Sequence, residues 1–86
     1  MSNGNRRDRD TYRYSLRDGR DLVQFGVTED PDARLAEHQR NRHKPNLTMT
    51  VEGPAVTREA ALAWERTRIE QYCRSHGGDK PRYNKI

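Results

Sequence analysis

Apolar and polar residues alternate in three short segments of the chain, as they do in β-strands with one buried face. These segments are residues 11–16, 22–27 and 46–51, and each is rich in residue types that favour strands. The sequence Arg-Asp-Gly-Arg at 17–20 separates the first two and has the composition of a tight turn. The pattern predicts a hairpin over residues 11–27 and a further strand at residues 46–51.

Two segments carry the start and stop signals of helices. Asp30 followed by Pro31 predicts a helix start, and Pro45 prevents extension far beyond Asn41. Thr57 predicts the start of a second helix, which continues to about residue 75 and is ended by the glycines at 77–78. An extended tail over residues 80–86 follows. We therefore expect an α/β (α+β) fold with a small three-stranded, largely antiparallel sheet flanked by helices.

The second predicted helix has an acidic residue within its apolar stripe. Helical spacing places Glu65 on one face with Leu62, Ile69, Tyr72 and Cys73. A buried carboxylate costs several kcal/mol unless it is paired or binds a cation. Glu65 is therefore either a site residue or one half of an ordinary helix-face salt bridge.

Composition limits the chain to one small domain. It has 86 residues, of which 30% are hydrophobic and 35% are charged. We expect a disordered tail at residues 1–10 and a single domain over 11–86. One cysteine excludes an intramolecular disulfide, and no segment resembles a signal peptide or a membrane span, so a cytoplasmic setting is the expectation.

The net charge of +4 makes nucleic acid a plausible partner. Basic residues gather in two stretches that would suit a phosphate backbone: Arg40, Arg42 and Lys44 in one, Lys80 and Arg82 in the other. The alternative is a solvated basic surface without a ligand.

Several other polar residues could belong to one site. Arg34 and His38 are four residues apart and project from one helix face, where they could bind phosphate. Tyr12 and Tyr14 alternate onto one side of the first strand. Asn84 lies in the C-terminal tail. Each also has a structural explanation, as an exposed helix face, a core tyrosine or a turn residue.

The order of these residues resembles that of the GIY-YIG nuclease superfamily, over about residues 11–84. Thr11-Tyr12 corresponds to the Ile-Tyr of the first motif, and Gln24-Phe25-Gly26 corresponds to Tyr-Ile-Gly in the second. The family's helix arginine, later glutamate and closing asparagine correspond to Arg34, Glu65 and Asn84.

The chain departs from the family pattern at three points. Asp10 replaces the first glycine, and Gln24 replaces the second tyrosine, which in the family helps to build the active site. The hairpin is one residue longer than usual, which leaves Tyr14 as the alternative to Tyr12.

The resemblance implies a metal-dependent endonuclease that hydrolyses phosphodiester bonds in nucleic acid, expected to be DNA. Glu65 would hold Mg²⁺ or Mn²⁺. Arg34 would contact the phosphate, and Tyr12, its pKa lowered by nearby cations, would activate water. Asn84 would anchor the tail and His38 would assist orientation or proton transfer.

The sequence is also compatible with two other functions. A degenerate member of the family would bind nucleic acid without cutting it, as the replacement by Gln24 suggests. A small protein-interaction module would use the basic face against an acidic partner. A separate partner could supply specificity, and the chain offers no membrane-binding segment.

Overall fold

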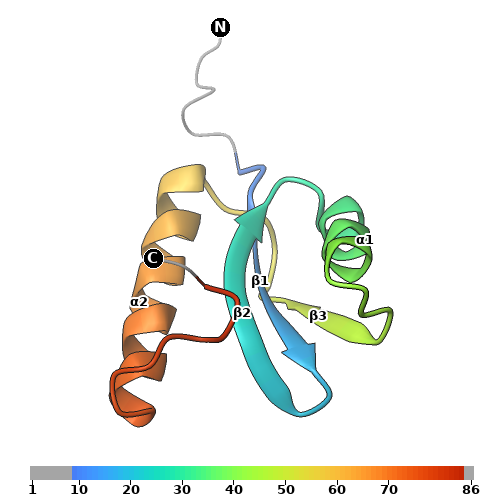
Figure 1. Ribbon diagram of the computed structural model, residues 1–86. Helices are drawn as coiled ribbons and strands as arrows, with labels where there is room; N and C mark the ends of the chain where they lie inside the picture. Colours follow the sequence, from blue (N-terminus) through green and yellow to red (C-terminus); the bar gives the residue numbers. More distant parts are fainter. Residues whose placement is uncertain (1–8, 85–86) are drawn as a thin grey trace, which may run out of the picture.

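The elements of secondary structure follow one another in the predicted order (Figure 1). The computed structural model describes residues 9–84. The strands are β1 (Tyr12–Asp18), β2 (Asp21–Thr28) and β3 (Leu47–Val51), and the helices are α1 (Pro31–Asn41) and α2 (Arg58–Ser75). The predicted α+β class is confirmed. Most of the tail expected at residues 1–10, and residues 85–86 of the expected domain, lie outside the described residues.

β1 is the central strand of the sheet, and it pairs antiparallel with β2 and with β3. The turn of the hairpin uses Gly19 with φ +66°, a left-handed conformation that glycine adopts without strain. A bulge lies in the hairpin, because Leu16 pairs with Gln24 while Arg17 pairs with Leu22. The bulge accommodates an additional residue of β2, Val23.

The helices lie on different sides of the strands, with α2 along β2 and α1 near β3 (Figure 1). The buried core cluster consists of Tyr14, Leu16, Val23 and Leu47, against which Leu35, Met49 and Tyr83 pack. Such a small core leaves a narrow margin of stability, so individual contacts matter.

Helix α1 begins and ends where its sequence signals predict. The Asp30 side chain accepts a hydrogen bond from the Ala33 amide at 3.2 Å, and Pro31 occupies the first turn. The helix ends at Asn41, and His43 then adopts φ +53°. This helix orients Arg34 and His38.

Helix α2 has the predicted ends but presents a different face to the sheet. Thr57 caps its first turn by accepting from the Ala60 amide at 3.2 Å. The contact face contains Ala61, which is fully buried, and Trp64 and Tyr72, whose rings meet Phe25 at centroid distances of 5.8 and 6.4 Å.

The prediction that the apolar stripe of α2 faces the core was therefore wrong for part of that stripe. Leu62 retains 38% exposure, and Ile69 and Cys73 line the outer surface of the helix beside it. Instead, α2 turns Trp64 and Tyr72 toward Phe25, and aromatic pairs of this kind contribute beyond the area that they bury. Within residues 9–84, no helix is both long enough and apolar enough to cross a membrane.

The C-terminal tail runs beside the outer edge of β2 and includes a turn, so it is not wholly extended as predicted. The Tyr83 amide donates to the Val23 carbonyl at 2.7 Å. The Asn84 side chain makes two hydrogen bonds with the backbone of Phe25, each 3.0 Å long. The amide group of Asn84 thus satisfies an edge-strand N–H and C=O as a neighbouring strand would.

Candidate functional site

A cleft of about 500 Å³ brings together residues from β1, β2, α1 and α2. We call it the Glu65 cleft, and it is lined by Tyr14, Gln24, Gly26, Arg34, Arg58 and Glu65, with residues 27–30 along one side. Five of these six residues were singled out from the sequence, and they come from segments far apart in the chain. Folding therefore collects Tyr14, Arg34 and Glu65 in one place.

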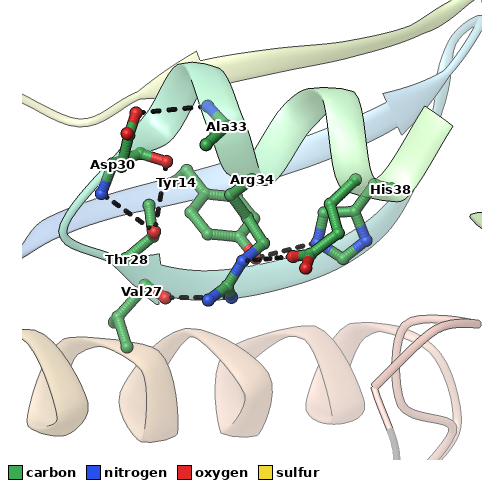
Figure 2. A network of polar contacts seen from close by, with 8 residues as sticks. Tyr14, Val27, Thr28, Asp30, Ala33, Arg34 and His38 are labelled. Carbon is green, nitrogen blue, oxygen red and sulfur yellow. Dashed lines mark hydrogen bonds and ion pairs between the residues drawn. The ribbon is translucent and has the colours of Figure 1, made fainter. Parts of the chain in front are cut away.

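Tyr14 is the tyrosine that the fold places in the cleft. Its side chain is 1% exposed, and its hydroxyl lies 3.1 Å from Nε2 of His38 (Figure 2). Tyr12, expected from the sequence, pairs with Thr28 nearer the end of the sheet and does not line the cleft. The site tyrosine is thus two residues further along β1 than expected, on the same face of the strand. The hairpin that contains it also has the bulge with its additional residue.

The approach of Tyr14 requires the glycine at position 26. Tyr14 and Gly26 are paired across β1 and β2, and the phenol ring lies over the glycine. A Cβ atom built on Gly26 would collide with the ring and hydroxyl of Tyr14. Gly26 therefore has a packing role in this chain.

Burial raises the pKa of the Tyr14 phenol above its usual value, although the nearby Arg34 guanidinium offsets part of the rise. The sequence-based expectation that cations would lower the pKa of the site tyrosine does not hold for Tyr14. Its hydroxyl is protonated at neutral pH and can donate to His38.

His38 supplies the acceptor for that hydroxyl. Burial lowers the pKa of its imidazole, and the positive charges of Arg42 and Arg34 lower it further, while Glu37 opposes them. The neutral ring has one nitrogen with a lone pair. Nε2 can therefore accept from Tyr14 and, when needed, take up a proton.

Arg34 is held at the cleft by two contacts from α1 and β2. Its Nε lies 3.1 Å from a carboxylate oxygen of Glu37, and its Nη1 reaches the Val27 carbonyl at 3.5 Å (Figure 2). The side chain remains 39% exposed, so its guanidinium is open to an anionic ligand.

Glu65 reaches the same cleft from α2 and is half-buried. Burial raises the pKa of its carboxyl, and the positive charge of Arg58 offsets part of the rise. Among residues 9–84 it forms no ion pair, since the salt bridges there involve other acids. The helix-face salt bridge considered from the sequence is absent from this part of the chain.

Gln24 presents an unpaired oxygen at the cleft. Its Oε1 is buried and has no hydrogen-bond donor among residues 9–84. A buried acceptor without a partner is costly unless a ligand or water satisfies it. No group of three His, Cys, Asp or Glu residues suited to a metal occurs in residues 9–84. The cleft is lined by Glu65 from α2 and by Gln24 and Thr28 from β2, all of which carry side-chain oxygens.

The remaining predicted site residues lie outside the cleft. Asn84 clasps β2 at Phe25, which agrees with an anchoring role. Lys44 pairs with Asp18 at 3.2 Å, and Arg42 covers the Tyr83 ring at 3.7 Å.

None of the residues of the two predicted basic stretches lines the Glu65 cleft. Arg40 is exposed on α1, Lys80 lies beside the outer face of α2, and Arg82 lines a second cleft near the hairpin turn. Arg68, on the aromatic face of α2, was not among the residues predicted from the sequence. Its spacing of four residues from both Trp64 and Tyr72 is the signal that could have identified it.

Comparison with family models, curated proteins and solved structures gave no match for this chain.

Proposed function

We propose that this protein is a metal-dependent endonuclease that hydrolyses phosphodiester bonds in nucleic acid, with DNA as the expected substrate. The observation that carries the proposal is the convergence of Tyr14, Arg34 and Glu65 on one cleft. These are an acid–base group, an anion-binding group and a carboxylate, which together suit phosphoryl chemistry. The resemblance to GIY-YIG nucleases adds support, with Tyr14 in place of Tyr12.

The residues present fit a hard divalent cation. Mg²⁺ and Mn²⁺ prefer oxygen ligands, and Mg²⁺ binds through one or two carboxylates with water and phosphate oxygens completing the shell. Within residues 9–84, Glu65 offers a half-buried carboxylate without an ion pair, and Gln24 offers a buried oxygen without a donor. A cation held there would neutralise charge on the scissile phosphate and the leaving oxygen.

In the proposed mechanism, the chain's residues orient the phosphate and remove a proton from water. Arg34 donates to the non-bridging oxygens as negative charge develops on them. The Tyr14 hydroxyl takes a proton from the attacking water while its own proton passes to Nε2 of His38, so the phenol is restored. The water oxygen forms the new bond to phosphorus, the bond to the leaving oxygen breaks, and the leaving oxygen takes up a proton from solvent while the water's proton equivalent is held on His38.

The test is cleavage of supercoiled plasmid and of single-stranded DNA and RNA in Mg²⁺ or Mn²⁺. Wild type should cut, and Glu65→Gln should not. Arg34→Gln should lose activity, whereas the matched α1 variant Arg40→Gln should keep it. Activity that survives in Glu65→Gln would indicate a contaminating nuclease or a different site.

Binding without cleavage is the second candidate function, and Gln24 favours it. A glutamine cannot act as the phenol of the second family motif, although Gln24 still lines the cleft. Metal-dependent affinity for DNA with no cutting by folded wild type would select this alternative.

A further inference from the structure

A second cleft lies between the hairpin turn, α2 and the C-terminal tail, and it shares no lining residue with the Glu65 cleft. Its volume is about 650 Å³, which falls in the size range of small-ligand sites. We call it the arginine cleft, after its four arginines: Arg17, Arg20, Arg68 and Arg82.

The arginine cleft is strongly basic. Among residues 9–84, Asp21 is the single acidic residue that lines it, and its carboxylate lies 3.8 Å from Nη2 of Arg82. Arg17, Arg20 and Arg68 form no salt bridge within residues 9–84. Arg17 donates from Nη1 to the Arg20 carbonyl at 3.4 Å, which leaves its other N–H groups free of that contact. The three guanidinium groups can therefore still meet an anion, and they match phosphate oxygens in geometry as well as charge.

Aromatic rings form part of the same wall. The rings of Tyr72 and His76 are stacked with centroids 3.7 Å apart and planes 3° from parallel. Nδ1 of His76 lies 2.8 Å from the Tyr72 carbonyl oxygen, which can only accept, so the ring donates its N–H there and is held in place. His76 remains exposed, so this pair offers a fixed, flat surface to a ligand.

Arg68 connects the charged and aromatic parts of the cleft. Its guanidinium carbon lies 5.1 Å from the centre of the Phe25 ring, which in turn meets Tyr72 edge-on. Cation–π contact with Phe25 fixes the position of the charge beside the stacked pair. A ligand with a phosphate and a planar ring could meet both features at once.

We infer that the arginine cleft binds single-stranded nucleic acid. Unpaired bases would stack on the Tyr72–His76 pair, and consecutive phosphates would lie against Arg17, Arg20 and Arg68. In a duplex the faces of the bases are covered by their neighbours, so this stacking is available to a single strand. Three arginines without acidic partners exceed what one phosphate requires, which favours a strand over a free nucleotide. The inference does not depend on catalysis, because no residue of the Glu65 cleft takes part.

The experiment measures fluorescence anisotropy of a labelled dT12 strand with the full chain in EDTA, where cleavage cannot contribute. Tyr72→Ala should weaken binding about tenfold, the scale expected for loss of base stacking. Arg68→Gln and His76→Ala should also weaken it. Arg66→Gln and Arg74→Gln are matched controls, because these arginines line the outer surface of α2 and carry the same charge change.

Further arms identify the ligand. A dT12 strand should bind more tightly than a 12-base-pair duplex or dTMP. Equal or tighter binding of the duplex would overturn the inference, as would competition by dTMP at the same concentration as dT12. If Arg66→Gln and Arg68→Gln weaken dT12 binding equally, the effect comes from overall charge and not from the arginine cleft. That result would also overturn the inference.

Separate measurements check that each variant is folded. Tyr72→Ala removes packing against Phe25, so far-UV circular dichroism and thermal unfolding must accompany each titration. His76→Ala provides the check, because His76 is exposed and its ring stacks on that of Tyr72. If folded His76→Ala and Arg68→Gln both bind dT12 as wild type does, the inference fails. Absence of nuclease activity would leave this result unchanged, so the two proposals fail independently.

Discussion

The hydroxyl of Tyr14 lies 3.1 Å from Nε2 of His38, and this contact joins the central strand β1 to helix α1. The two rings meet at an angle of 61° with their centroids 6.0 Å apart. A buried phenol with a raised pKa therefore faces an imidazole with a lowered pKa. Such a pair can pass a proton without forming a stable phenolate.

Tyr14→Phe tests that pair directly. The variant keeps the ring that packs in the core but removes the hydroxyl, so stability should change by only about 1 kcal/mol. If Tyr14 transfers a proton, the initial rate of plasmid cleavage should fall by about 100-fold or more. Tyr12→Phe is the matched control on the same strand and should cut normally. Loss of activity in Tyr12→Phe alone would return the catalytic role to Tyr12.

His38 should make stability depend on pH. Its pKa in the folded state is below the ordinary 6.5, so the unfolded chain binds its proton more readily. The contribution of His38 is therefore complete above pH 6.5 and is lost as the pH falls through the folded value.

Urea unfolding at intervals from pH 5 to pH 8 measures this effect as the difference between wild type and His38→Gln. The groups facing His38 are Tyr14 from β1 and Arg34, Glu37 and Arg42 from α1 and its C-terminal end. They are unchanged in the variant, so their own titration largely cancels. A free energy of unfolding that falls equally with acid in both proteins would contradict the prediction.

The elements were predictable because their signals are local. Asp30, Pro31 and Thr57 act on the backbone within one turn, and Gly19 permits the hairpin turn by its own conformational freedom. The grouping of Arg34 with Glu65 was anticipated through the family resemblance.

Three features depended on tertiary contacts and were not predictable in the same way. Helix α2 rotates to place Trp64 and Tyr72 on Phe25, which the one-dimensional apolar stripe could not indicate. The choice of Tyr14 over Tyr12 follows from pairing with Gly26, which requires the register of the bulged hairpin. The clasp of Asn84 on Phe25 joins residues 59 positions apart.

Gly26→Ala should destabilise the protein. The new methyl group would overlap the Tyr14 phenol, which is fully enclosed and held by His38, so the ring cannot easily move aside. Overpacking of this kind costs roughly 1–3 kcal/mol. Urea denaturation of Gly26→Ala, Tyr14→Ala and the double variant gives the coupling free energy between positions 14 and 26. The double variant should be more stable than the sum of the single effects predicts, because the clash requires both groups. Simple additivity would show that the clash is not the cause.

Asn84→Ala should loosen the tail from the sheet. The change removes two hydrogen bonds to the edge strand at Phe25, and we expect a loss of about 1–3 kcal/mol in the free energy of unfolding. Hydrogen exchange should show faster exchange at the Phe25 amide, which donates to the Asn84 oxygen at 3.0 Å. Asn41→Ala, at the exposed end of α1, is the control and should leave both measurements unchanged. Unchanged exchange at Phe25 in folded Asn84→Ala would exclude the clasp as a stabilising contact.

Glu65→Gln tests separately whether the Glu65 carboxylate destabilises the fold and whether it binds a divalent cation. Without added metal, the half-buried charge has no ion pair in residues 9–84, so replacing it with a neutral isostere should keep or slightly raise the melting temperature. With added Mg²⁺ or Mn²⁺, wild type should become more stable, because a ligand that binds only the folded state shifts the unfolding equilibrium. Glu65→Gln should lose most of that shift. Glu70 is exposed on the same helix, so Glu70→Gln should retain the shift.

A melting temperature several degrees lower in metal-free Glu65→Gln would mean that the carboxylate stabilises the fold. In that case the proposed cation site would lose its main support.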